Sequence, residues 1–235
     1  MKGTLRLQRS GDLKKIKGYK EGAWWVQNLG AQIPVKLLGK IKNENVLDLC
    51  AAPGGKTAQL LNEGAFVTAL DVSEKKIKKL YANITRLQLE KNLTVLAKDF
   101  LKWNNKEKYN KILLDVPCSA TGTIRKNPDV LWNKNEKDID RLSKLQIKLL
   151  SKAIEILSKN GVLIYSNCSM QFEEGENVID FFIKKNKVKL LPIKAEELKL
   201  FPKDIFKNGL IRTLPYTYEQ EDSLDGFFIA RLTKT

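Results

Sequence analysis

Short apolar runs alternate with amphipathic segments along most of the chain. The apolar runs have the length of strands and end at turn residues, and they predict strands over residues 46–50, 65–71, 94–99, 111–117, 161–166, 189–193, 209–214 and 226–232. The amphipathic segments repeat apolar positions three or four residues apart, and they predict helices over residues 57–62, 74–90, 135–159 and 173–185. This alternation predicts a mostly parallel sheet with helices on both faces, and we expect the last strand to run antiparallel.

The first 40 residues follow a different pattern. Leucines, basic residues and glycines are mixed at the start, and an aromatic stretch then leads into an amphipathic helix that should reach Lys42. We therefore expect an N-terminal segment packed on the core, residues 1–40, and one α/β domain, residues 41–235, which is long enough for a substantial core. Trp24 and Trp25 near the start of this helix either pack in the core or stack on bases.

The chain is organised around a loop of small residues at 48–57, Asp-Leu-Cys-Ala-Ala-Pro-Gly-Gly-Lys-Thr. A predicted strand precedes the loop and a helix follows it, which is how an α/β sheet presents backbone N–H groups to a nucleotide-like ligand. The spacing does not match a phosphate-cradling loop, because the first glycine of G-x-x-x-x-G-K-[ST] falls on Cys50. The dinucleotide fingerprint G-x-G-x-x-G is also absent. ATPase and GTPase functions are therefore disfavoured.

Acidic residues end three of the predicted strands, at Asp71, Asp99 and Asp115. In open α/β sheets, ligands bind beyond the carboxyl ends of the strands. Asp71 follows the glycine loop at close to the spacing expected for an acid that accepts ribose hydroxyls, and Asp99 could face an adenine amino group. Taken singly, either acid could instead cap a helix or hold a turn.

Two cysteines follow apolar strands at the same predicted edge. Cys118 lies in Asp-Val-Pro-Cys-Ser-Ala-Thr-Gly-Thr at 115–123, and Cys168 lies in Tyr-Ser-Asn-Cys-Ser at 165–169. A thiol at such a place becomes a nucleophile when it ionises, helped by a lysine or by a helix N-terminus. A single cysteine is commonly buried and inert. Two at neighbouring strand ends, one of them beside Asp-x-Pro, favour a catalytic role.

The amino-acid composition limits which classes of protein the chain can belong to. The formal net charge of +15 attracts polyanions, although a lysine-rich solvated surface would give the same excess. Three widely spaced cysteines and no histidine argue against a disulfide framework and a Cys/His zinc site, so no metal is expected. No apolar run approaches the roughly 20 residues that cross a bilayer, and no signal core follows Met1. We expect a cytoplasmic protein without a membrane partner, with a monomer as the default.

Together these motifs resemble those of RNA cytosine-carbon-5 methyltransferases, and most closely the Sun/Fmu group of the bacterial RsmB type. The resemblance spans roughly residues 18–232 and rests on the loop at 48–57, on 115–129, on 165–169 with Glu173 and Glu174, and on Asp-Gly-Phe-Phe at 225–228. A Pro-Cys paired with a later Ser-x-Cys-Ser is far more specific than any glycine loop.

The resemblance implies a Rossmann-like, class I fold dependent on S-adenosylmethionine, with a mostly parallel seven-stranded sheet and an antiparallel last strand. It implies methyl transfer to carbon 5 of a cytosine in RNA, with small-subunit ribosomal RNA favoured and transfer RNA the nearest alternative. The implied cofactor-binding residues are Cys50, Ala51, Ala52, Pro53, Gly54, Gly55, Lys56, Asp71, Asp99 and Asp115. The implied catalytic residues are Cys168 as nucleophile, Cys118 in product release and Asp115 in stabilising charge at ring nitrogen 3. The candidate substrate contacts are Lys56, Arg125, Lys126 and Asn167.

Two departures from the family pattern bear on substrate recognition. The residue before the nucleophile is usually threonine and is Asn167 here; because asparagine keeps a hydrogen-bonding side chain, activity is expected to survive. Proteins of this group also carry an N-terminal RNA-binding domain of helices, which this chain lacks. The chain is therefore expected to be a catalytic fragment, or a short form that recruits RNA by charge.

The same motifs bear on three alternative functions. A DNA cytosine methyltransferase would use its Pro-Cys cysteine as the nucleophile and would need no second one. An amino-directed methyltransferase would carry Asp/Asn-Pro-Pro-Tyr/Phe where this chain has Asp-Val-Pro-Cys at 115–118. A basic RNA-binding module that keeps the fold without catalysis is the alternative from a different class, and failure to bind S-adenosylmethionine would support it.

Overall fold

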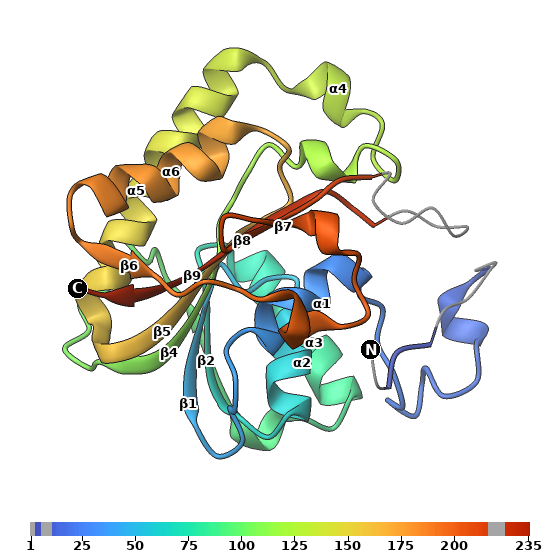
Figure 1. The fold of residues 1–235 in the computed structure, drawn as a ribbon. Helices are drawn as coiled ribbons and strands as arrows, with labels where there is room; N and C mark the ends of the chain where they lie inside the picture. The colour runs from blue at the N-terminus through green and yellow to red at the C-terminus, as the bar shows by residue number, and fades with distance from the viewer. Residues whose placement is uncertain (1–2, 6–10, 216–223) are drawn as a thin grey trace.

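The computed structural model describes residues 3–5, 11–215 and 224–235, and within them nine strands form one sheet in the order β3-β2-β1-β4-β5-β9-β8-β7, with β6 paired to β9 (Figure 1). The parallel part consists of β1 (Asn45–Leu49), β2 (Phe66–Asp71), β3 (Leu93–Ala97), β4 (Tyr109–Asp115) and β5 (Leu157–Asn167). Antiparallel pairings add β6 (Val188–Leu190), β7 (Phe206–Lys207), β8 (Leu210–Thr213) and β9 (Phe227–Lys234).

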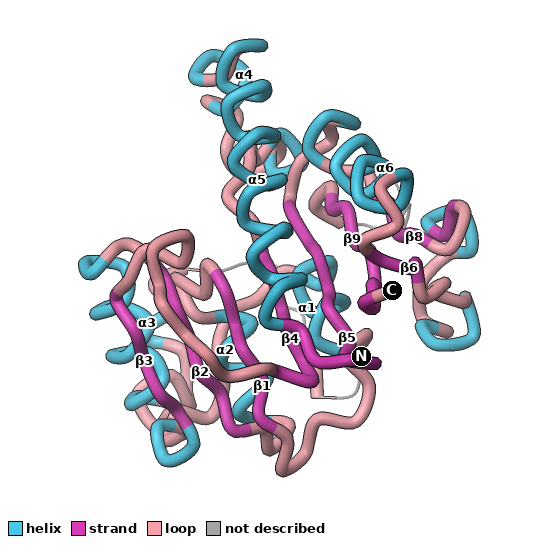
Figure 2. The backbone as a smooth tube through the Cα atoms, turned by 90° about the vertical axis from the view of Figure 1, so that its left-hand side faces the viewer, coloured by secondary structure: helices cyan, strands magenta, loops and turns pink. Residues whose placement is uncertain are grey.

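Helices cover both faces of the sheet (Figure 2). One face carries α1 (Leu29–Lys36), α2 (Gly55–Asn62) and α3 (Glu74–Arg86). The other carries α5 (Glu136–Ile156) and α6 (Glu176–Lys184), and the short α4 (Val130–Asn133) precedes α5. Short 3-10 turns complete the described elements: η1 (Leu13–Lys15), η2 (Glu90–Asn92), η3 (Thr121–Thr123), η4 (Phe172–Glu174), η5 (Ala195–Leu198) and η6 (Lys203–Ile205).

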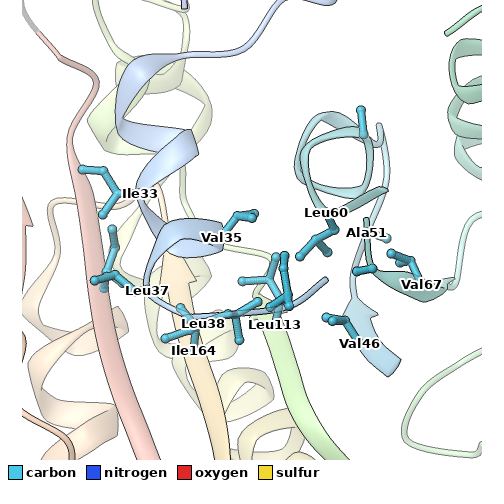
Figure 3. Close-up of a cluster of buried hydrophobic side chains, with 14 of the residues drawn as sticks. Ile33, Val35, Leu37, Leu38, Val46, Ala51, Leu60, Val67, Leu113 and Ile164 are labelled. Carbon is cyan, nitrogen blue, oxygen red and sulfur yellow. The ribbon is translucent and has the colours of Figure 1, made fainter. Parts of the chain in front are cut away.

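The central strands are buried on both faces, and their alternate side chains enter two hydrophobic clusters. Val46 of β1 belongs to the cluster under α1 and α2, whereas its neighbour Leu47 belongs to the cluster under α5 and α6. Figure 3 shows the first cluster, where Leu60 of α2 lies near Val46 and Leu113. Strands covered on both faces need near-continuous apolar sequence, which is why these runs were recognisable.

The predicted fold class is confirmed, with differences in the extent of its elements. The described sheet has nine strands, where the sequence pattern predicted eight and the family resemblance implied seven, and β7 is the strand that no apolar run predicted. The helix predicted over 135–159 ends at Ile156, because Leu157 is buried and pairs with Tyr109 to begin β5. The pairing of Leu157 with Tyr109 therefore sets the end of the helix, although the polar residues after Leu157 have the sequence pattern of a helix.

The two tryptophans before α1 make different packing contacts. The helix expected to reach Lys42 ends at Lys36, where a turn redirects the chain toward β1. Trp25 packs against the first cluster, and Trp24 lies edge-on to Tyr19 with ring centroids 5.4 Å apart. These contacts favour packing over base stacking for both tryptophans.

Candidate active site

The loop after β1 is shaped by two residues with left-handed backbone angles. Cys50 has a φ of 59° and Gly54, which directly precedes α2, has a φ of 101°. A Cβ atom added at Gly54 would lie 2.6 Å from Leu80 Cγ of α3. Only glycine fits there without displacing α3, so the small residues that keep this turn open also let it pack closely.

Asp71 ties this loop to the end of β2. Its carboxylate accepts hydrogen bonds from the backbone N–H of Ala52 at 3.2 Å and of Ser73 at 2.9 Å. Asp99 lies beyond the end of β3 and accepts from the backbone N–H of Leu101 at 2.9 Å. Both acids therefore hold turns, and each carboxylate retains further lone pairs for a ligand.

Asp48 opens the loop motif and is fully buried in β1. It accepts a hydrogen bond from Thr57 Oγ1 at 2.6 Å, while its Oδ1 has no hydrogen-bond partner among the described residues. Burial raises the pKa of this carboxyl to about 7. Asp48 was not among the predicted site residues, although a carboxylate inside an otherwise apolar strand is a signal that sequence alone offers.

Lys56 of α2 and Asp115 at the end of β4 form an ion pair, with Nζ 2.6 Å from Oδ2. The other oxygen of Asp115, Oδ1, accepts a hydrogen bond from Ser166 Oγ at 2.7 Å. An ammonium on one oxygen and a hydroxyl on the other fix the direction of this carboxylate. The structure thus brings three predicted site elements together, from the loop helix, β4 and β5.

The two predicted thiols meet. Cys118 Sγ and Cys168 Sγ are 3.5 Å apart. The hydrogen bond from Cys118 lowers the pKa of Cys168, and the Lys56 ammonium adds to this against burial and the Asp115 carboxylate. The same hydrogen bond, burial and the Glu174 carboxylate raise the pKa of Cys118 well above its usual range. These opposite directions make Cys168 the thiol of the pair that ionises more readily.

A polar network that the sequence analysis did not assign holds the two cysteine segments. Glu174 is fully buried and accepts hydrogen bonds from the backbone N–H of Ser119 at 2.9 Å and from Gln146 Nε2 at 3.0 Å. The hydroxyls of Ser119 and Ser169, which follow the two cysteines, lie 3.0 Å apart. Glu174 had been noted only as part of the family motif. Gln146, a polar residue on the buried face of α5, was the signal for this network.

The structure corrects the expectation that Asn167 contacts the substrate. Its side chain is 1% exposed. Nδ2 donates to the carbonyl oxygen of Glu174 at 2.7 Å, and Oδ1 accepts from the backbone N–H of Ser169 at 2.9 Å. The asparagine that stands in place of the usual threonine therefore shapes the turn after β5 from inside the protein.

The segment after Cys118 carries the other predicted substrate contacts at the surface. Lys126 Nζ lies 3.0 Å from Asp225 Oδ2, and Arg125 is exposed. Trp132 of α4, which the sequence analysis did not single out, is 86% exposed, so an aromatic side chain accompanies these cations. Arg125 and Lys126 remain predictions as RNA contacts.

Backbone segments pack closely beside the thiols. The N–H of Gly122 donates to the carbonyl oxygen of Cys168 at 2.9 Å, and the N–H of Gly226 donates to that of Gly122 at 2.8 Å. A Cβ atom added at Gly122 would lie 2.1 Å from the carbonyl oxygen of Gly226. No flexible side chain stands in this contact, so a larger residue must push the two backbones apart.

Gly122→Ala is therefore expected to lower the free energy of unfolding by roughly 1–3 kcal/mol. Urea unfolding followed by circular dichroism measures the change. Gly11→Ala is the matched control, because nothing lies within 4 Å of a Cβ built at Gly11. Equal stability of the two variants would contradict the close packing of Gly122 on Gly226.

One edge of the sheet thus collects a small-residue loop, a carboxylate held by a lysine, and two thiols in contact with each other. This set suits attack by a thiolate beside a nucleotide-like ligand. Among the described residues, no group of three or more cysteine and acidic side chains could hold a metal ion. Nor does that part of the chain include a helix long and apolar enough to cross a membrane.

The chain is similar to bacterial ribosomal RNA methyltransferases over nearly its whole length. The model of a family described as 16S rRNA methyltransferase RsmB/F matches residues 35–233, which include the loop and both thiols. Ribosomal RNA small subunit methyltransferase B of Citrobacter koseri is 39% identical over 98% of this chain and 52% of its own length. Its counterpart in Pasteurella multocida is 35% identical, over 98% of this chain and 51% of its own length. The chain spans about half the length of these curated relatives.

Solved structures give the same result for the fold. NSun6 from Pyrococcus horikoshii, solved with SFG, superposes with a TM-score of 0.79 and 31% identity, over 96% of this chain and 56% of that one. A methyltransferase homolog protein from Pyrococcus horikoshii superposes with a TM-score of 0.76 and 30% identity, over 97% of this chain and 73% of that one.

Proposed function

The chain belongs to the RsmB/F family of 16S rRNA methyltransferases, and from this premise we propose that it transfers a methyl group from S-adenosylmethionine to carbon 5 of a cytosine in RNA. Small-subunit ribosomal RNA is the preferred substrate in this proposal. The observation that carries it is the 3.5 Å contact between Cys118 Sγ and Cys168 Sγ. A second thiol beside a nucleophilic one is useful when a covalent intermediate must be released.

The residues around the loop fit S-adenosylmethionine, which would supply a methyl group carried on a sulfonium. Gly54 lets the loop turn tightly against Leu80 of α3, and the buried carboxylate of Asp71 has lone pairs left for ribose hydroxyls. Val72 follows directly and is 71% exposed, an apolar surface that an adenine ring would cover. The unpartnered Oδ1 of buried Asp48 also marks a place for a donor.

In the proposed mechanism Cys168 activates the base. Carbon 5 of cytosine is a poor nucleophile while the ring is aromatic. The Cys168 thiolate attacks carbon 6, and the ring becomes an enamine-like species whose carbon 5 can take the methyl group. Lys56 and Asp115 lie beside the thiols, and a proton held between this pair and ring nitrogen 3 would stabilise the negative charge that develops there.

Cys118 completes the cycle. Once Cys168 is bonded to carbon 6, the Cys118 thiol loses its thiolate acceptor and releases its proton to water. The Cys118 thiolate then takes the proton from carbon 5, the carbon–sulfur bond breaks, and its electron pair returns to Cys168. Cys118 lies 3.5 Å from Cys168 in the free protein, so its sulfur is within reach of the base that Cys168 holds. The pair ends as it began, with the proton on Cys118.

RNA is the substrate that the surface favours. The net charge of +15 attracts a polyanion, and Arg125, Lys126 and the exposed Trp132 follow Cys118 along the chain. The target base must leave its stack to reach the thiols, which is easiest in a loop or bulge. Methyl transfer to transfer RNA is a second possible outcome of the test below.

The proposal is tested by incubating the protein with methyl-labelled S-adenosylmethionine and, separately, small-subunit ribosomal RNA, transfer RNA and DNA. Mass spectrometry of the nucleosides should find 5-methylcytidine in the ribosomal RNA. Methylation of transfer RNA alone would replace the substrate, and methylation of DNA alone would contradict the RNA assignment. Binding of RNA without methylation of any substrate would support the alternative of a catalytically silent RNA-binding module.

A further inference from the structure

Glu174 connects the two cysteine segments through both its side chain and its backbone. Oε1 and Oε2 accept from the backbone N–H of Ser119 at 2.9 Å and 3.2 Å, and the Ser119 hydroxyl also donates to Oε2. Gln146 Nε2 donates to Oε1 at 3.0 Å. The carbonyl oxygen of Glu174 accepts from Asn167 Nδ2 and from the Tyr165 hydroxyl, each at 2.7 Å.

These contacts reach the residue after Cys118 and the residue before Cys168. We propose that Glu174 is a positioning residue for the thiol pair, which fixes the contact between the two sulfur atoms and holds its own carboxylate on the Cys118 side of that contact. The inference rests on the proposed function only for the chemical roles of the two thiols.

The charges around the pair are distributed unevenly. The Glu174 carboxylate acts on Cys118, where it adds to the hydrogen bond and the burial that raise the pKa of that thiol. The Lys56 ammonium acts on Cys168 and lowers the pKa of that thiol against the opposing Asp115 carboxylate. The Glu174 carboxylate is buried and held by neutral donors on the Cys118 side of the pair. The two thiols therefore have different electrostatic surroundings.

Two further groups lie near the thiols, one on β5 and one on β8. Burial raises the pKa of Tyr165 in β5 well above its usual range, so this phenol stays neutral. Arg212 of β8 donates to the carbonyl oxygen of Ser169 at 2.6 Å, and its guanidinium forms an ion pair with Glu176. The carboxylate of Glu176 therefore offsets the charge of Arg212, and Glu174 has no such cation among the described ion pairs.

Alkylation of the free protein by iodoacetamide as a function of pH tests the inference, with each cysteine peptide quantified by mass spectrometry. Glu174→Gln removes the charge with little change in shape. Cys118 should then react at lower pH than in the parent protein, because its proton is held less tightly. Glu173→Gln is the matched control, because Glu173 is the exposed neighbour on the same turn. Superimposable Cys118 profiles for the two variants would overturn the proposal.

Turnover gives a second readout that a purely electrostatic change would not explain. Glu174→Gln should lose roughly 10²-fold in methyl transfer, because small displacements of reacting groups have effects of this size, and it should retain a protein–RNA adduct. If Glu174→Gln does not fold, Glu174→Asp keeps the charge but withdraws it from Ser119, so release should be slow and Cys118 should react at lower pH than in the parent. Parent-like turnover in Glu174→Asp would then overturn the positioning role. Failure of the proposed function itself is distinguishable, since the parent would modify no RNA while the alkylation profiles still differed.

Discussion

Replacing Cys168 by alanine is expected to reduce methyl transfer on the order of 10⁴-fold or more, as removal of a catalytic nucleophile does in other enzymes. The ring of the base cannot be activated without a bond from sulfur to carbon 6. Binding of S-adenosylmethionine should persist, because Cys168 lies at the end of β5 and outside the loop after β1. Methyl incorporation into RNA and equilibrium dialysis of the cofactor measure the two quantities on the same protein.

Cys168→Ser separates loss of the nucleophile from loss of packing. A serine hydroxyl fills almost the same space as the thiol, but it ionises at a far higher pH. Lys56 does not lower the pKa of a hydroxyl enough for it to react as an alkoxide. We expect Cys168→Ser to be as inactive as Cys168→Ala while its thermal unfolding stays close to that of the parent. Activity within tenfold of the parent in either variant would remove Cys168 from the nucleophile's role.

Lys56→Met is expected to lower methyl transfer roughly 10²-fold at neutral pH, an effect that should shrink as the pH rises. The hydrogen bond from Cys118 lowers the pKa of Cys168 most, and Lys56 contributes to the same shift. The reactive form is the thiolate, so activity is present above the pKa of Cys168 and is lost as the pH falls through it. Removing Lys56 raises this pKa and also leaves Asp115 without its partner.

The acid limb of the pH–rate profile should therefore move to higher pH in Lys56→Met. Lys36→Met is the matched control, because Lys36 pairs with Glu63 on the surface, between α1 and α2. Its profile should coincide with that of the parent. An unchanged acid limb in Lys56→Met, with activity lost equally at every pH, would mean that Lys56 acts only through substrate or cofactor binding.

The parallel half of the sheet could be predicted because its strands are buried on both faces and read as uninterrupted apolar runs. The boundary between α5 and β5 could not be predicted, because the pairing of Leu157 with Tyr109 in the folded sheet decides where the helix ends. The two-residue strand β7 was not predicted either, because it is too short to form an apolar run and exists only through its pairing with β8. β-propensity is set by such neighbours more than by local sequence.

The position of the two thiols was predictable, whereas the residues that hold them were not. Cys118 and Cys168 both follow parallel strands, and the register that pairs Asp115 with Ser166 brings the two strand ends together. Successive side chains of a strand point to opposite faces, so Asn167 lies inside while its neighbour Cys168 reaches the edge. Glu174 acquires its role only when the η4 turn carries it to Ser119, a contact over 55 positions in sequence.

The most direct test of the mechanism is the location of a covalent RNA adduct in Cys118→Ala. This variant keeps the nucleophile but lacks the base for release, so incubation with RNA and S-adenosylmethionine should accumulate a protein–RNA species that survives a denaturing gel. Peptide mass spectrometry should find the nucleotide on Cys168, and Cys168→Ala should form no adduct. An adduct on Cys118 in Cys168→Ala, with none in Cys118→Ala, would contradict the account and exchange the roles of the two thiols.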